Sequence, residues 1–363
     1  MKSQPQDNRI LLLFSSGLRT RYVEDIPRAL GEPYGAHLRF RYRKKHIPDG
    51  LFQQLADASL KGTTTLVVYV DATEKGKGPF FVPCRFGRLE TTLCLGDIVV
   101  LIFELTDYAY GPNGPAFASE LQVQATDAPH WEGDTLKGTF CSLLGHAPQT
   151  CERTVDIDKW QKIVAQIKER GDFRDEPFFY KVDGLFRPGS GSPEHPQGGI
   201  YKLKANVDYE FRIAHYIPEN VNVPTQTVKE RRWIMVEIPG ESTQVLTQSR
   251  VAIDSPYDWN RVRFRVEGRS RRQYQLASFY RIRNPGLSAS IENALYDFDL
   301  PIEISSEQLK TILVSVGIGI LLGLQQIVTL YKSQQLDWTG GALVVLVGIG
   351  AATVAAFGLR RPG

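Results

Sequence analysis

The sequence predicts a mainly β protein, with an α+β N-terminal domain, then a β-sandwich, and a C-terminal two-helix transmembrane hairpin. Three observations lead to this prediction. Apolar and charged residues alternate along several segments, as they do in half-buried strands. Between positions 200 and 300, strand-like segments follow one another about every ten residues, which is typical of a sandwich. Near its end the chain contains two long apolar runs separated by a short polar break.

The two apolar runs are long enough to be membrane-spanning helices. Residues 309–330 carry a single charged side chain, that of Lys310 at the start, and residues 341–359 carry none. A helix of about 22 residues spans roughly 33 Å, which exceeds the ~30 Å hydrocarbon core of a bilayer. We therefore expect transmembrane helices at 309–330 and 341–359, joined by a loop that Tyr331 and Trp338 anchor in the headgroup layer.

The cations that flank these runs predict their orientation. Lys310 lies at the start of the first run, Arg360 and Arg361 follow the second, and the loop between the runs holds one cation, Lys332. Basic residues near the ends of spanning helices stay on the cytoplasmic side. The sequence thus predicts a protein of the inner or plasma membrane, with the soluble domains and both termini in the cytoplasm. The apolar segment 10–14 is too short for the core of a signal peptide, which agrees with this orientation.

The predicted membrane helices share a face of small residues that recur every four positions, continued in the first helix by a glutamine. These helix-packing residues are Ser315, Gly319, Gly323 and Gln326 in the first helix and Gly348 and Ala352 in the second. Small residues let helix backbones approach closely, and an amide at membrane depth seeks a hydrogen-bonding partner. Two interpretations stay open: the face packs the two helices of one chain together, or it drives self-association, including assembly into a pore.

Residues 1–172 are predicted to form a β-rich N-terminal binding or sensor domain with a few helices. The apolar segment 98–105 lacks alternation, which predicts a strand buried on both faces. Apolar residues at helical spacing from Trp160 to Ile167 predict a helix over 156–170. The other predicted strands are 10–14, 37–43, 63–70, 80–86, 88–95, 121–125 and 139–144, and the other predicted helices are 22–30 and 48–60. This succession favours a partly open barrel or a mixed sheet.

Residues 173–199 are predicted to be a linker, because Gly and Pro are frequent from Pro188 to Gly199. A β-sandwich-like domain is expected over residues 200–300. Its strand-like segments are 200–205, 209–216, 233–238, 245–253, 261–267 and 274–282. The acidic segment 297–307 is expected to connect this domain to the first membrane helix.

Two predicted strands carry basic outer faces. The candidate ligand- or lipid-binding residues on and beside them are Arg39, Arg41, Arg43, Arg261, Arg263, Arg265, Arg271 and Arg272. A row of outward charges also keeps an exposed strand from pairing with another chain, and this structural role is an open alternative. Anionic headgroups attract such clusters by about 1 kcal/mol per cation, which favours lipid or a partner protein. Nucleic acid is not expected, because it would require aromatic residues on the basic face and Phe264 is predicted to point inward.

The composition is that of a globular protein without a catalytic or metal signature. Hydrophobic residues make up 42% and charged residues 23% of the chain, and a net charge of +3 does not by itself indicate a nucleic-acid partner. The spacing of Cys84, Cys94, Cys141 and Cys151 is too wide for an ordinary zinc site, so free thiols in a reducing cytosol are expected. The sequence contains no recognisable catalytic motif, and we expect neither an enzyme nor a cofactor.

These features support two hypotheses of different classes. The first is a membrane-anchored cytosolic binding or sensor protein for a small ligand or a cytosolic protein, whose tail self-associates and perturbs the membrane as an effector. A sensor followed by two membrane helices is similar in architecture to bacterial membrane effectors in phage defence. The second hypothesis is a membrane-tethered scaffold for a cytosolic protein complex, without pore activity. An enzyme with no recognisable motif is the remaining alternative.

Overall fold

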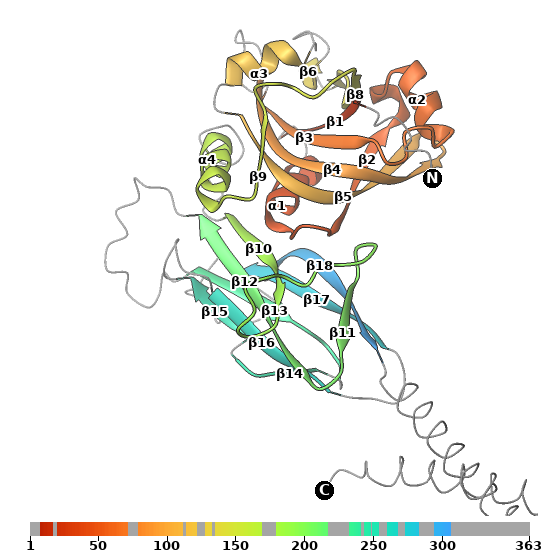
Figure 1. Ribbon diagram of the computed structural model, residues 1–363. Coiled ribbons are helices and arrows are strands. Elements are labelled where there is room, and N and C mark those ends of the chain that lie inside the picture. The colour runs from red at the N-terminus through yellow and green to blue at the C-terminus, as the bar shows by residue number, and fades with distance from the viewer. Residues whose placement is uncertain are drawn as a thin grey trace, which may run out of the picture.

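The computed structural model contains two β-rich domains, drawn one above the other in Figure 1. It describes residues 8–16, 20–71, 79–111, 114–121, 128–132, 135–168, 179–216, 232–240, 243–247, 249–253, 260–267, 273–282 and 294–305. Within these ranges the protein is mainly β, as predicted, and no helix there is long and apolar enough to cross a membrane. The predicted spans 309–330 and 341–359 lie outside the described residues. The same is true of the proposed helix-packing residues Ser315, Gly319, Gly323, Gln326, Gly348 and Ala352.

The N-terminal domain is a mixed sheet with helices on both faces. Its elements are β1 (Ile10–Ser16), α1 (Thr20–Gly31), β2 (His37–Arg43), the short 3₁₀ helix η1 (Lys44–His46), α2 (Asp49–Ala56), β3 (Thr64–Asp71), β4 (Phe80–Leu95), β5 (Ile98–Tyr110), α3 (Gly114–Glu120), β6 (His130–Glu132), β7 (Thr135–Lys137), β8 (Cys141–Leu144), β9 (Glu152–Thr154) and α4 (Ile157–Lys168). The sheet has the order β2-β5-β4-β3-β1-β8, and β9 also pairs with β5. β1 and β3 are parallel, whereas the other neighbours are antiparallel.

The central strands are apolar on both sides, and each face of the sheet has its own core. Every residue of β1 is buried. Leu11 and Leu13 belong to a core that also contains side chains of α1, α2 and α4, whereas Leu12 and Phe14 belong to a second core with α3. Figure 1 shows the same division, with α1 below the sheet and α3 above it.

The helix predicted from periodicity, 156–170, is observed as α4. Its four apolar residues at helical spacing, Trp160, Ile163, Val164 and Ile167, are all buried. The Asp156 carboxylate accepts a hydrogen bond of 2.8 Å from the backbone N–H of Asp158, which caps the first turn. Local capping and the apolar stripe therefore agree with the position of this helix.

The predicted break between two strands at Gly87 is wrong. Segments 80–86 and 88–95 form a single strand, β4, that continues through Gly87. A Cβ at position 87 would lie 2.7 Å from the backbone oxygen of Glu104 on β5, so only glycine fits there. The register between β4 and β5 also shifts between Arg85 and Gly87. A glycine that suggests a turn in the sequence marks instead a close approach of two backbones.

The second domain is a β-sandwich, as predicted. Its strands are β10 (Phe179–Phe186), β11 (Tyr201–Lys204), β12 (Val207–Tyr216), β13 (Arg232–Glu237), β14 (Thr243–Val245), β15 (Arg250–Ile253), β16 (Asn260–Val266), β17 (Gln273–Ile282) and β18 (Ala294–Ser305). One sheet has the order β10-β12-β16-β14 and the other β11-β18-β17-β13-β15. Aromatic rings fill the space between them: Phe211 of the first sheet meets Phe279 of the second, with ring centroids 5.3 Å apart.

The sandwich has wider boundaries than the sequence indicates. β10 lies inside the predicted linker 173–199 and pairs with β12. β18 continues to Ser305, so most of the predicted connector 297–307 is a strand paired with β17 and β11. The predicted strand 245–253 divides into β14 and β15, which belong to different sheets. The Gly- and Pro-rich composition begins only after Arg187, so it describes the segment that follows β10 and not β10 itself.

Helix α1 joins the two domains. The backbone oxygen of Leu30, in its last turn, accepts hydrogen bonds from Trp160 Nε1 on α4 (3.0 Å) and from the Tyr108 hydroxyl on β5 (3.1 Å). The next residue, Gly31, lies against β10, because a Cβ there would be 3.0 Å from the backbone oxygen of Tyr180. One buried core consequently contains residues of both domains.

A buried polar cluster centred on Asp297 of β18 lies beside this contact. Its carboxylate accepts hydrogen bonds from Arg281 Nε (2.8 Å) and from the Tyr180 hydroxyl (2.8 Å). Its backbone oxygen accepts a further bond of 2.8 Å from Arg28 Nε of α1. Asp297 thereby connects β10, β17 and α1, and its charge balances the buried guanidinium of Arg281.

Removing the Asp297 charge tests this cluster. Asp297→Asn leaves the Arg281 guanidinium buried without its carboxylate, and we expect the free energy of unfolding to fall by about 3 kcal/mol. Tyr180→Phe deletes one neutral donor from the same carboxylate, and the expected loss is only about 1 kcal/mol. Urea unfolding followed by tryptophan fluorescence measures both variants. If both variants lost only about 1 kcal/mol of unfolding free energy, the buried ion pair would contribute no more to stability than a neutral hydrogen bond.

Candidate ligand-binding cavities between the domains

Two cavities lie where the domains meet. The α1–β2 cavity, about 760 Å³, is bordered by α1, β2, the loop at 198–200 and parts of β17 and β18. The β5–β10 cavity, about 560 Å³, is bordered by β5, β10, the segment before α4 and residues 193 and 195. Both volumes fall in the range of about 300–1,000 Å³ that is usual for small-molecule sites.

The α1–β2 cavity is lined by charges of both signs. Its acidic residues are Glu24, Asp25, Glu32 and Asp299, and its basic residues are Arg28, Arg39 and Arg41. The predicted alternation of β2 is confirmed, because Leu38, Phe40 and Tyr42 are buried and Arg39, Arg41 and Arg43 are exposed. Two of these three arginines, Arg39 and Arg41, line the cavity, where they lie among its carboxylates.

Glu32 follows α1 directly and is buried at the junction of the domains. Burial raises the pKa of its carboxyl group to about 8, and the neighbouring cations Arg28 and Arg85 offset this only in part. Burial acts in this direction because it disfavours the charged form. Glu32 is therefore mostly protonated at neutral pH, so it adds little negative charge to the junction.

The β5–β10 cavity contains two buried cations that share one aromatic ring. Arg85 of β4 and Lys181 of β10 are each 2% exposed. The Cζ atom of Arg85 lies 3.9 Å from the ring centroid of Tyr108, and Lys181 Nζ lies 5.2 Å from the same centroid. The negative face of an aromatic ring attracts cations, most strongly where water is excluded. Tyr108 is itself held by its hydrogen bond to Leu30.

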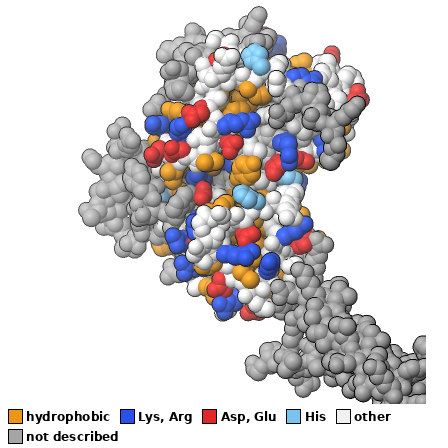
Figure 2. Space-filling model, in the orientation of Figure 1, with side chains coloured by type: hydrophobic (Ala, Val, Ile, Leu, Met, Phe, Trp, Pro, Cys, Tyr) orange, Lys and Arg blue, Asp and Glu red, His pale blue; other side chains and the backbone are white. Residues whose placement is uncertain are grey.

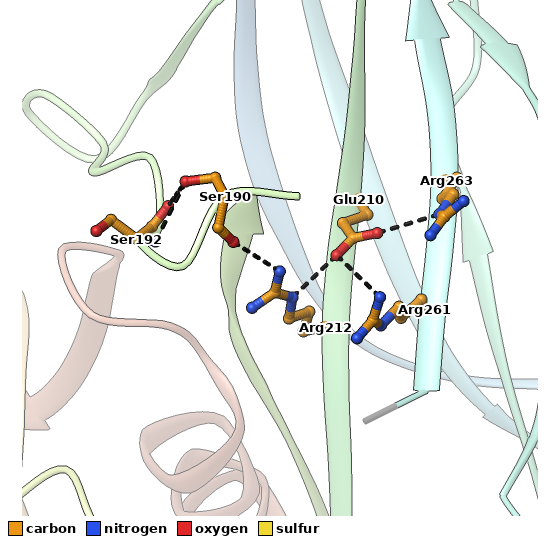
Figure 3. Close-up of polar contacts among 6 residues, drawn as sticks. All are labelled: Ser190, Ser192, Glu210, Arg212, Arg261 and Arg263. Atoms are coloured by element: carbon orange, nitrogen blue, oxygen red, sulfur yellow. Dashed lines mark hydrogen bonds and ion pairs between the residues drawn. The ribbon is translucent and has the colours of Figure 1, made fainter. Parts of the chain in front are cut away.

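The basic face of β16 is engaged in ion pairs with β12. Glu210, whose side chain is fully buried, lies among Arg212 (Nε to Oε1, 3.0 Å), Arg263 (Nε to Oε2, 3.1 Å) and Arg261 (Nη1 to Oε1, 3.7 Å), as Figure 3 shows. Burial raises the pKa of Glu210, but the hydrogen bonds from Arg212 and Arg263 and the charge of Arg261 outweigh it and keep the pKa below its ordinary value.

Arg265, also on β16, forms a bidentate pair with Asp208: its Nε donates to Oδ1 (2.6 Å) and its Nη2 donates to Oδ2 (3.1 Å). The alternation of β16 is confirmed, with Val262, Phe264 and Val266 buried. β16 belongs to the sheet without β17 and β18, and neither cavity is lined by its arginines. On the face of the molecule drawn in Figure 2, acidic and basic side chains are interspersed over both domains. These pairs favour the structural alternative for this strand.

The remaining predicted basic residues, Arg271 and Arg272, lie outside the described residues. The cysteines Cys84, Cys94, Cys141 and Cys151 are free thiols, as expected. Burial raises the pKa of the Cys84 thiol to about 12, which makes it a poor nucleophile. Over the described ranges, no group of three or more His, Cys, Asp or Glu side chains could hold a metal ion.

The sequence prediction missed the three residues that distinguish the domain junction, Glu32, Arg85 and Lys181. Each interrupts a segment that is otherwise mostly buried. Arg85 stands in FFVPCRF and Lys181 in FFYKVDGLF. A single cation within an apolar strand is the signal that could have identified the last two, because long charged side chains are rarely fully buried unless they are paired.

No known protein-family model matches this chain, and no curated protein is similar to it in sequence. The geometry of the cavities and the sequence of the tail therefore carry the functional argument.

The raised pKa of Glu32 predicts a pH-dependent stability. Between the ordinary glutamate pKa of 4.5 and about pH 8, the folded protein keeps a proton that the unfolded chain loses. Stability should therefore decline across this window by up to about 1.4 kcal/mol per pH unit, and it should change little from this group below pH 4.5. In Glu32→Gln we expect that decline to disappear. Urea unfolding at a series of pH values measures it.

Glu24→Gln is the matched control, because Glu24 is exposed on α1, the helix that precedes Glu32. This variant should keep the wild-type pH profile. A Glu32→Gln profile that runs parallel to the wild type would contradict the assigned protonation.

Proposed function

We propose that this chain is a membrane-anchored binding protein, in which the two β domains take up a ligand between them and the C-terminal tail holds them at a bilayer. The observation that carries the proposal is the pair of cavities at the domain junction, with charged side chains buried beside them. Junctions between domains are preferred places for small-molecule sites. The apolar runs 309–330 and 341–359 supply the anchor.

The last strand connects the two parts of this proposal. β18 lines the α1–β2 cavity from Tyr296 to Pro301 and ends at Ser305, just before the first apolar run. A ligand that shifts the domains relative to each other would act on a strand that leads directly into the tail. Such coupling requires the ligand to bind two arrangements of the protein with different affinity. The small-residue face with Gly319 and Gly323 is where the tail would respond, by self-association.

A tethered scaffold without a ligand is the rival proposal. A scaffold needs an exposed surface for its partners, and it has no use for cations buried at a cavity. Burying Arg85 and Lys181 removes two charges from water, which is unfavourable unless partners compensate. The cavities therefore favour the binding protein.

Fractionation of cells that express the full chain tests the anchor. We expect the full chain in the membrane fraction, resistant to alkaline extraction, and residues 1–305 in the soluble fraction, because the tail alone supplies apolar surface of bilayer length. A full chain that is extracted at high pH would show that the tail does not span the membrane.

Mass measurement in detergent tests the self-association. The full chain is expected to be an oligomer, and Gly319→Ile or Gly323→Ile should lower its mass because the branched side chain separates the helices. Leu322→Ile, in the same helix, is the matched control and should leave the mass unchanged. Monomers throughout would remove the basis for an effector that assembles through its tail.

A further inference from the structure

We infer that the β5–β10 cavity binds a small molecule through an anionic group, a phosphate or a carboxylate, held by the guanidinium of Arg85. The inference rests on the proposed binding function and names the class of ligand. Arg85 is 2% exposed and lines the cavity, and its Nε and Nη1 have no hydrogen-bond partner in the part of the chain that the structure describes. Buried N–H groups are unfavourable without an acceptor, and an oxyanion is the acceptor that best matches a guanidinium.

The carboxylates at this cavity have other cationic partners. The Asp183 carboxylate lies 3.6 Å from Lys181 Nζ, and that of Asp107 lies 3.6 Å from Arg153 Nη1. Among the described residues, no carboxylate is hydrogen-bonded to the Nε or Nη1 of Arg85. Glu32 acts on Arg85 electrostatically, but its raised pKa leaves it mostly neutral. Arg85 is therefore the cation of this cavity whose charge is least balanced by the protein.

The guanidinium is also fixed in place before a ligand arrives. Its Cζ atom lies 3.9 Å from the ring centroid of Tyr108, and the Tyr108 hydroxyl donates to the Leu30 backbone oxygen. Stacking occupies the face of the guanidinium and leaves the N–H groups at its edge for an acceptor. A group held in this way loses little conformational entropy on binding.

A second polar group supports the same ligand class. The Thr106 hydroxyl lines the cavity, is shielded from solvent, and has no hydrogen-bond partner within the described ranges. A hydroxyl can donate to an oxyanion, as an arginine does. Arg85 from β4, Thr106 from β5 and Lys181 from β10 thus bring two cations and a donor to one cavity of about 560 Å³.

Equilibrium dialysis of the full chain in detergent tests the inference, with labelled inorganic phosphate, acetate and choline as probes. We expect saturable binding of phosphate or acetate with a dissociation constant of about 1 mM or tighter, and no saturable binding of choline. A preference between the two anions would identify the group as a phosphate or a carboxylate. Arg85→Met keeps the apolar stem but removes the donors, and it should weaken anion binding at least about tenfold.

Val155→Trp provides a second variant that leaves the buried residues unchanged. Val155 is 71% exposed and lies at the wall of the cavity, so a tryptophan there should obstruct entry and weaken anion binding. The matched control is Leu95→Trp, because Leu95 is 63% exposed and is not part of either cavity. This control is expected to bind anions as the wild type does.

Two results would overturn the inference. One is the absence of saturable anion binding, and the other is equal anion binding by the wild type, Arg85→Met and Val155→Trp. Saturable binding of choline that Val155→Trp abolishes would also overturn it, but would leave the proposed binding function intact. Membrane fractionation of Arg85→Met should match the wild type, so failure of the anchor and failure of the anion site are separate results.

Discussion

The hydrogen bonds to the backbone oxygen of Leu30 fix the end of α1, the part of the N-terminal domain that contacts β10 of the sandwich. This oxygen accepts hydrogen bonds from Trp160 and Tyr108, so one carbonyl group at the end of α1 holds both α4 and β5. A helix has four carbonyl groups at its C-terminus without partners inside the helix, and these groups need hydrogen-bond donors from elsewhere. Here two buried aromatic side chains supply the donors. Because Trp160 and Tyr108 are also part of the hydrophobic core, a movement of the end of α1 would disturb the packing of that core.

This constraint places Gly31 and Glu32 against the sandwich and thereby positions the cavities. Gly31 lies so close to the backbone of Tyr180 that a side chain would not fit without a shift. Glu32 then enters a buried environment next to Arg28 and Arg85. The α1–β2 cavity borders Glu32, and the β5–β10 cavity borders Arg85. The same contact that joins the domains therefore also brings their buried ionisable groups together.

Much of the fold follows from patterns in the sequence. The alternation in β2 and β16 correctly identifies which residues are buried, because a half-buried strand requires period two. The periodicity of α4 is equally reliable. The errors occur where tertiary contacts override local signals. β4 continues through Gly87, where β5 approaches so closely that only glycine fits. The sequence does not predict β10, because the segment that follows it is rich in Gly and Pro, a composition typical of a linker.

The candidate site was less predictable than the fold. Arg39 and Arg41 were identified from alternation and do lie at a cavity. Arg85 could not be placed in this way, since a cation in a strand is normally expected to face solvent. Its burial depends on the irregular register near Gly87 and on the ring of Tyr108, which comes from the neighbouring strand. Neither contact can be inferred from the order of residues along β4 alone.

The two basic strands differ in what their charges can do for a ligand. The arginines of β16 surround Glu210 and Asp208, and these three arginines have side chains that are about half exposed, so solvent weakens their ion pairs. Their hydrogen bonds are directed at the protein itself, so an external anion would have to compete with carboxylates already in place. Arg85 is 2% exposed, and its Nε and Nη1 have no hydrogen-bond acceptor among the described residues. A buried cation with unused donors attracts an anion more strongly than several exposed cations whose donors are occupied, because the low dielectric of the interior screens it less.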